Sequence, residues 1–335
     1  MSGSDWVSYE QVYNSGFLDK TVEVGYMAIS NLLSNLGVDF WFFYIVIKTL
    51  AFVVFYRIIF KNKNEDPYFS FMIFLASFGY FMFIDCPFRN LIAVSIFLLS
   101  IKYIISKDYL RYALVVILAS TFHLTALIML PIIFLEKLSK VKSKNLLFIY
   151  LFLYLFLLLG GIDLLFNITE TIFPYMYKRL IFYMDRSVSV SALYSPGLLI
   201  RFFVFVLMLY YREMITERYK RGELIINLSY VYIILSLISY AFPLLFRLAL
   251  YTSPFYVIVV GMIAGILKPF NKLVLKSTFL FLALTITHVT ITSKDDYVPY
   301  SNIIPYVIKQ KFPTYEERKV YNKINSPYRE KNKDK

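Results

Sequence analysis

Long apolar runs, separated by short polar and basic segments, dominate the chain. A helix needs roughly 20 mostly apolar residues to cross the hydrocarbon core of a bilayer. About nine runs approach that length, so the pattern predicts an all-α polytopic membrane protein with about 9–10 transmembrane helices. The runs are Phe40–Phe60, Tyr68–Ile84, Phe88–Ser106, Tyr109–Leu135, Leu146–Phe166, Leu198–Met214, Leu224–Tyr240, Leu245–Leu267 and Leu273–Thr292.

The segments before and after these runs are more polar. Residues 1–39 carry Asp5 and Glu10 near the start, which argues against a cleavable signal peptide. Within this stretch, Val24–Leu36 has a modest helical pattern of apolar residues. We therefore expect an extracytoplasmic N-terminal arm at 1–39, a transmembrane domain at 40–292 and a basic C-terminal tail at 293–335.

The fourth run, Tyr109–Leu135, is too long for one straight span and too short for two. Polar residues interrupt it at Ser120–His123, and Pro131 follows. Irregular backbone at membrane depth is tolerated where it is buried in protein or lines water. The sequence therefore predicts a broken or re-entrant helix here, with both of its ends on the same side of the membrane.

The distribution of basic residues supports that arrangement. With a re-entrant fourth segment, five loops holding 17 Lys or Arg face one side, and the opposite turns hold 6. The positive-inside rule makes the richer side cytoplasmic. If the fourth segment were a full span, the basic tail would lie in the cytoplasm, but the basic loops would no longer be concentrated on that side. The five basic segments are 57–63, 102–111, 137–144, 212–221 and 268–276.

Composition excludes several classes of function. The chain has 2 His and 1 Cys, too few for a metal cluster or a disulfide scaffold, so we expect no metal and no cofactor. Its net charge of +13 is spread between apolar runs, which indicates membrane topology rather than nucleic-acid binding. No nucleotide-binding or nucleotide-sugar motif is present.

Three arginines at the mouths of spans are the first candidates for function. They are Arg89, Arg201 and Arg247, all on the proposed external side. Each side chain has a plain alternative, which is to reach the lipid headgroups from the end of its helix. A guanidinium group is always charged and its planar fork matches phosphate oxygens. Three of them at one membrane face therefore favour binding of a lipid-linked diphosphate.

Candidates for acid–base chemistry are less distinct. His123 lies inside the broken fourth segment, where a hydrogen-bonded structural histidine is the simpler interpretation. External carboxylates could take a proton from an attacking hydroxyl, but no pair of them has diagnostic spacing. They are Asp5, Glu23, Asp85, Asp163, Glu170 and Asp185.

An ordered series of short motifs runs from residue 3 to about residue 300. The motifs are Gly3-Ser4-Asp5-Trp6 with Tyr9 and Tyr13, Glu23-Val24-Gly25-Tyr26, Arg89-Asn90-Leu91-Ile92-Ala93, Phe122-His123-Leu124-Thr125-Ala126-Leu127-Ile128, Arg247 with Tyr251, and Pro299-Tyr300. Together they resemble the EpsG family, the Wzy-type polymerases of O-antigen, capsule and exopolysaccharide. Asn90 stands where the family usually has Gln, and Thr125 where it has Ser. The family also carries a transmembrane helix before the first motif, so either this chain lacks that helix or its start lies upstream.

The resemblance implies a GT-C-like architecture and a function. Such glycosyltransferases transfer a growing glycan from undecaprenyl diphosphate onto the next lipid-linked repeat unit at the periplasmic face of the bacterial inner membrane. Arg89, Arg201 and Arg247 would bind the diphosphate, and Asp5, Glu23 or His123 would activate the acceptor hydroxyl. The expected partners are the lipid-linked oligosaccharide, the bilayer and a chain-length regulator, without nucleic acid. Two alternatives stay open: a flippase or transporter of lipid-linked oligosaccharide, and a membrane acyltransferase that modifies polysaccharide.

Overall fold

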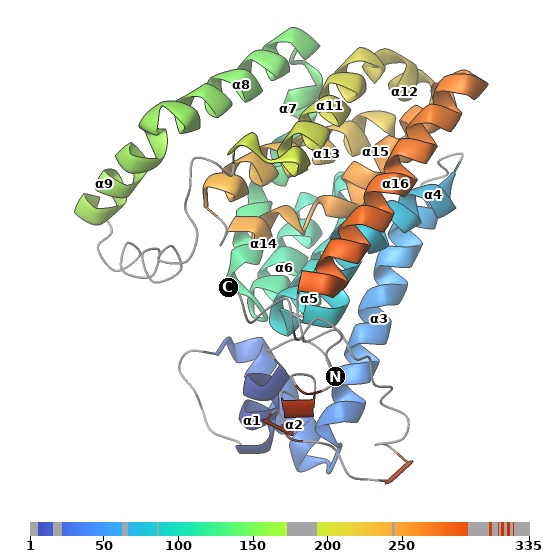
Figure 1. The fold of residues 1–335 in the computed structure, drawn as a ribbon. Coiled ribbons are helices and arrows are strands. Elements are labelled where there is room, and N and C mark those ends of the chain that lie inside the picture. Colours follow the sequence, from blue (N-terminus) through green and yellow to red (C-terminus); the bar gives the residue numbers. More distant parts are fainter. Residues whose placement is uncertain are drawn as a thin grey trace.

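A computed structural model describes residues 6–15, 22–61, 66–85, 87–172, 193–242 and 245–293, with isolated residues between 308 and 324. This part of the chain is all-helical, which confirms the predicted class (Figure 1). The elements are α1 (Trp6–Ser15), α2 (Val24–Asn35), α3 (Phe40–Lys61), α4 (Pro67–Phe74), η1 (Leu75–Asp85), α5 (Phe88–Ile105), α6 (Tyr109–Ser120), η2 (Leu124–Phe134), α7 (Leu135–Ser139), α8 (Ser143–Phe156), η3 (Leu157–Gly161), α9 (Ile162–Ile172), α11 (Pro196–Tyr210), α12 (Arg212–Arg218), α13 (Gly222–Ala241), α14 (Phe246–Ala249), α15 (Ser253–Ile266) and α16 (Pro269–Ser293).

The apolar runs fold into the helices that the sequence predicts. Among the described residues, 6 helices are long and apolar enough to cross a membrane. Three shorter apolar helices occupy further runs, at Tyr109–Ser120, Pro196–Tyr210 and Ser253–Ile266. The run at Leu245–Leu267 is broken before α15, because Pro254 in the first turn of α15 cannot continue a helix from the preceding residues. The protein is therefore a multi-pass membrane protein.

The fourth run is a helical hairpin, as predicted. α6 ends at Ser120, and η2 starts at Leu124 and returns antiparallel to it. The hydroxyl of Tyr112 on α6 donates to the carbonyl of Met129 on η2 at 2.5 Å. The two ends of the hairpin meet on one side, where Lys107 and Glu136 form an ion pair at 3.1 Å. Neither half alone has the roughly 20 residues that a span requires.

Polar contacts also connect other basic segments at that side of the bundle. The guanidinium of Arg212 donates to the carbonyls of Val141 at 2.6 Å and Ser139 at 3.0 Å. Lys276, two turns into α16, forms an ion pair with Asp66, which caps α4. We call this side the basic end and the opposite side, where α1 and α2 lie, the arm end (Figure 1). The assignment of the basic end to the cytoplasm stays a prediction.

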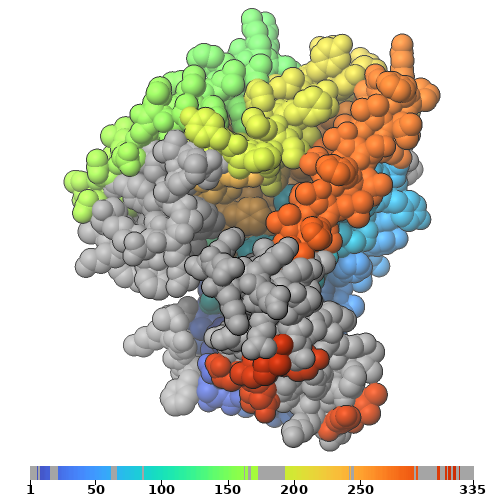
Figure 2. All heavy atoms as spheres, viewed as in Figure 1, coloured from blue at the N-terminus to red at the C-terminus, as the bar shows by residue number. Residues whose placement is uncertain are grey.

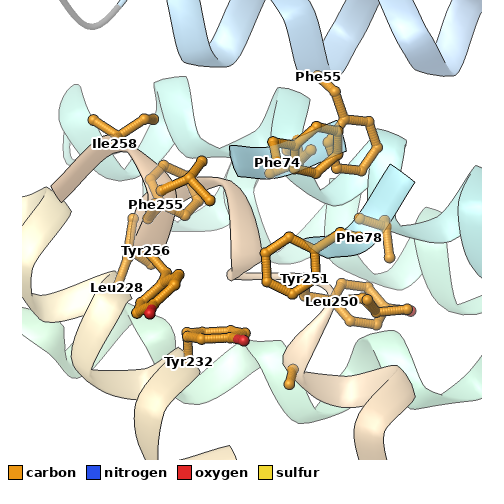
Figure 3. Packing of buried hydrophobic residues seen from close by; sticks show 14 of the residues in the cluster. Phe55, Phe74, Phe78, Leu228, Tyr232, Leu250, Tyr251, Phe255, Tyr256 and Ile258 are labelled. Atoms are coloured by element: carbon orange, nitrogen blue, oxygen red, sulfur yellow. The ribbon is translucent and has the colours of Figure 1, made fainter. Parts of the chain in front are cut away.

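Helix α15 forms the centre of the bundle. Its residues from Ser253 to Ala264 are all buried, as expected for a helix that is apolar on all sides. Rings from α3, α4, η1 and α13 surround it (Figure 3). Phe55 and Phe74 stack with ring centroids 5.0 Å apart, and Tyr232 lies 4.7 Å from Tyr256.

The N-terminal arm is held to the arm end by aromatic contacts. Trp6 contacts Trp41 with ring centroids 5.0 Å apart, and Tyr13 stacks on Phe43 at 5.5 Å. The hydroxyl of Tyr13 also donates to the carbonyl of Val38 at 2.7 Å. Because these rings are buried, α1 and α2 form part of the folded structure rather than a free extension.

Close backbone contact joins the arm to the tip of the hairpin. The N–H of Gly25 donates to the carbonyl of Thr121 at 2.8 Å. A Cβ atom at residue 25 would lie 2.8 Å from that same oxygen, so only glycine fits without displacement. This contact explains the glycine of the Glu23-Val24-Gly25-Tyr26 motif.

We expect Gly25→Ala to destabilise the docked arm by about 1–3 kcal/mol, the usual cost of overpacking a tight contact. Emission of Trp6 and Trp41, the 2 tryptophans of the chain, should shift to longer wavelength because the rings become exposed. Val24→Ala is the control, since Val24 is 71% exposed. Equal denaturant midpoints for wild type and Gly25→Ala would contradict this account of the interface.

Candidate functional site

Three of the predicted site residues meet where the arm contacts the bundle. Glu23 precedes α2, Arg89 lies in the first turn of α5, and His123 lies between α6 and η2. One carboxylate oxygen of Glu23 pairs with a terminal nitrogen of Arg89. The other oxygen lies 2.9 Å from Nδ1 of His123. The carboxylate thus bridges two cationic or donor groups that belong to separate elements of the bundle.

Local structure explains how each side chain reaches this point. Pro87 caps α5 and directs Arg89 to the arm end. His123 has extended backbone, with φ −156° and ψ 116°, and caps the start of η2, where its carbonyl accepts from the N–H of Ala126 at 3.0 Å. Glu23 is the residue before the first turn of α2, where the helix dipole favours negative charge.

The electrostatics of the bridge favour an ionised carboxylate. Burial alone would raise the pKa of Glu23, but the hydrogen bond with His123 and the positive charge of Arg89 outweigh it, so the pKa lies below its usual value. An anionic Glu23 accepts a hydrogen bond from the Nδ1–H group of His123. That pairing assigns the free lone pair of the ring to Nε2.

Nε2 of His123 is buried and has no hydrogen-bond partner among the described residues. A carboxylate that orients an imidazole and leaves its second nitrogen free is the arrangement of a general base and its orienting partner. The carboxylate also stabilises the imidazolium that forms when Nε2 takes a proton. We refer to Glu23 and His123 as the dyad.

The backbone of Arg247, on α14, contacts the residue that follows Arg89. The amide nitrogen of buried Asn90, adjacent to Arg89, donates to the carbonyl of Arg247 at 3.5 Å. Close by, the hydroxyls of Thr125 and Tyr251 are 3.2 Å apart and join η2 to the turn after α14. In the described part of the chain, the guanidinium of Arg247 has no ion pair or hydrogen bond, so its charge is uncompensated.

Arg201 is placed in a different cluster. Its Nε donates to the hydroxyl of Tyr232 at 2.8 Å, and its Nη1 to the hydroxyl of Tyr240 at 2.6 Å and the carbonyl of Gly197 at 2.9 Å. None of these partners contacts Glu23, Arg89 or His123 through a polar group in the described residues. The structure thus divides the three predicted arginines between two places.

Of the remaining acidic candidates, the two whose side chains the structure describes do not join the dyad. Asp163 and Glu170 are exposed on α9. Asp5, Asp185, the side chain of Asp85 and the Pro299-Tyr300 motif lie outside the described residues. Within the described ranges, no three metal-ligating side chains lie close enough together to hold an ion.

Several contacts were not predicted from the sequence. The ring of Tyr9 lies under Arg89, with the guanidinium carbon 5.8 Å from its centroid. Lys48, an unusual charge inside α3, donates to the carbonyl of Phe83 at 2.7 Å and lies 4.1 Å from the centroid of Tyr44. The tyrosines around Arg201 carry no sequence motif.

Comparison with known proteins identifies one relationship. The model of the EpsG family matches residues 1–307. No curated protein sequence and no solved structure matches the chain. The likeness to GT-C folds therefore stays a prediction.

The lowered pKa of Glu23 predicts how arm docking depends on pH. A carboxylate whose pKa is depressed in the folded state stabilises that state above its unfolded pKa, and this contribution is lost as pH falls through the folded pKa. Tryptophan emission should therefore stay constant from neutral pH down past the ordinary range of glutamate and shift to longer wavelength only below it.

Variants separate Glu23 from its neighbours in this titration. Glu23→Gln should weaken docking by about 1–3 kcal/mol at neutral pH and should lack the acid transition. Burial raises the pKa of Glu10 near Trp41, so Glu10→Gln is the matched control and should keep the transition at low pH. Persistence of the transition in Glu23→Gln would assign it to another group.

Proposed function

The chain belongs to the EpsG family, and we propose that it is a glycosyltransferase that polymerises polysaccharide from lipid-linked repeat units. The substrates in this proposal are oligosaccharides on undecaprenyl diphosphate, used at the periplasmic face of a bacterial inner membrane. The polymer is an O-antigen, a capsule or an exopolysaccharide. The observation that carries the proposal is the dyad with its free Nε2 at the arm end of the bundle.

The reaction requires one proton transfer and one displacement. The acceptor hydroxyl of one repeat unit attacks the anomeric carbon of the donor glycan, and the bond from that carbon to the diphosphate oxygen breaks. His123 Nε2 takes the hydroxyl proton, and Glu23 stabilises the resulting imidazolium. The electron pair of the broken bond leaves with undecaprenyl diphosphate. No redox change occurs.

In this proposal Arg89 and Arg247 have different electrostatic roles. Arg89 is neutralised by Glu23, so it orients the carboxylate and keeps it ionised. Arg247 has no countercharge in the described part of the chain. Its planar guanidinium can donate two parallel hydrogen bonds to the diphosphate as negative charge develops on the leaving group. In this proposal the base comes from the hairpin and the arm, and the cation comes from α14.

The charge distribution supports the proposed side of the membrane. The basic segments lie at the opposite end of the bundle from the dyad, and basic loops favour the cytoplasm. The dyad would then face the periplasm, where lipid-linked repeat units are polymerised. A chain-length regulator is a candidate partner in this setting.

We expect His123→Gln to lower polymerisation about 100- to 10,000-fold, the usual contribution of a general base. The measurement is the length distribution of surface polysaccharide on gels, in cells that lack the native gene and carry the variant. His288→Gln is the matched control, because His288 is the other histidine and is exposed on α16. Equal polymer lengths for both variants would contradict the base assignment.

The deletion strain itself tests the reaction class. A polymerase deletion should leave single repeat units on the surface lipid, because export continues. Loss of every repeat unit would indicate a flippase, and normal chain length with altered acyl groups would indicate an acyltransferase. Either result would overturn the proposed function.

The arginine assignment predicts a separate pattern. Arg247→Ala and Arg89→Ala should each abolish chain lengthening while protein abundance in the membrane stays unchanged. Arg247→Lys should restore little activity, since lysine lacks the planar fork. Arg218→Ala at the exposed basic end is the control and should give wild-type chains. Full-length polymer from both Arg89→Ala and Arg247→Ala would refute the assignment.

A further inference from the structure

Arg201 lies in a cluster of polar groups that has more donors than acceptors. A guanidinium carries five N–H donors. Two hydrogens of Nη1 and the one of Nε are used by Gly197, Tyr240 and Tyr232. Both hydrogens of Nη2 have no acceptor among the described residues. The cluster therefore presents the two Nη2 hydrogens as unused donors.

The same cluster lacks a countercharge. No ion pair joins Arg201 to a carboxylate among the described residues. Tyr232 and Tyr256 are buried, and the guanidinium lies 5.5 Å from the centroid of Tyr240. An uncompensated charge inside a membrane domain is costly and is a mark of function. An anion would satisfy both the charge and the free donors.

A cavity is open beside Arg201. Its volume is about 270 Å³, and polar groups of Gly197, Arg201 and the tyrosines form one part of its wall. Apart from Ser77, the rest of the wall is apolar. It comes from α4, η1, α11 and α16, with Phe279 and Ile286 among its residues. The surface is hollowed between α11 and α16, and gold to orange atoms, in the shades of α13 to α15, lie deeper between them (Figure 2).

Gly197 allows Tyr240 and Arg201 to pack closely against the backbone of α11 in the cavity wall. A Cβ atom there would lie 2.5 Å from the hydroxyl of Tyr240 and 3.1 Å from Nη1 of Arg201. The close approach of Tyr240 to the backbone of α11 is therefore possible only with glycine. The wall fixes the guanidinium by three hydrogen bonds, which is the preorganisation that an anion site needs.

We propose that the Arg201 cavity binds the phosphate or diphosphate group of a membrane lipid, whose chain leaves sideways between α11 and α16. The apolar wall on α16 suits an isoprenoid or acyl chain, and the donors around Arg201 suit phosphate oxygens. The inference rests on the proposed function, because a reaction between two lipid-linked substrates requires two anion sites. In the proposed function Arg247 supplies one, and Arg201 supplies the other.

Binding of farnesyl diphosphate to the purified full chain in nanodiscs tests the site. Arg201→Gln should weaken binding at least about 10-fold, because a charge-assisted fork is lost. Tyr240→Phe should weaken it several-fold and keeps the shape of the wall. Arg218→Gln, at the exposed basic end, should bind as wild type does. Unchanged affinity in both Arg201→Gln and Tyr240→Phe, with melting curves like wild type, would overturn the proposal.

Two further ligands identify what is recognised. Inorganic pyrophosphate, which has the anion without the chain, should compete at least about 10-fold less well than farnesyl diphosphate, and farnesol should not compete. Equal competition by pyrophosphate would overturn the lipid part of the inference. His123→Gln should bind farnesyl diphosphate as wild type does. A variant without polymerase activity can therefore still confirm this site.

The lateral route has its own test. Ala283 on α16 lines the cavity and is buried, whereas its neighbour Leu284 is 62% exposed. Ala283→Trp should fill the cavity and reduce binding of farnesyl diphosphate at least about 10-fold, because overpacking excludes the chain. Leu284→Trp adds the same ring to the outer face and should leave binding unchanged. Equal binding by the two variants would show that the chain does not pass along α16.

Discussion

The carboxylate of Glu23 is the contact on which the site depends. It joins the arm to Arg89 on α5 and to His123 at the tip of the hairpin, with no other carboxylate at this point in the described chain. A half-buried carboxylate is stable only when its charge is compensated. The same bond that compensates Glu23 also fixes the imidazole and leaves Nε2 free. Docking of the arm and formation of the dyad are therefore one event.

The broken fourth segment makes this contact possible. A continuous helix would have carried residues 121–123 across the membrane with their backbone groups already paired. The hairpin instead presents a turn, and the N–H of Gly25 satisfies the carbonyl of Thr121. Unpaired backbone at membrane depth is tolerated only where protein or water satisfies it. The arm thus provides the hydrogen-bond donor that the backbone of this turn requires, and the turn positions His123.

Apolar runs and polar interruptions were enough to predict the helices and the hairpin, because membrane helices satisfy their backbone locally. The dyad was not predictable as a pair. Glu23 is separated from Arg89 by 66 positions and from His123 by 100, and no periodicity reports such contacts. Helix α1 was not predicted from the sequence either. Ring contacts with α3 stabilise it, and its own residues have no clear helical periodicity.

Similar position in the sequence gave the three arginines the same expected role, yet their surroundings differ. Arg89 is compensated by a carboxylate, whereas Arg201 and Arg247 are not compensated in the described residues. A base needs a neighbouring negative charge, which would repel a diphosphate bound at the same point. A diphosphate needs positive charge that no carboxylate has already neutralised. Separating Arg201 from Glu23 satisfies both requirements. Arg247 meets the second requirement, because no carboxylate in the described residues neutralises its charge.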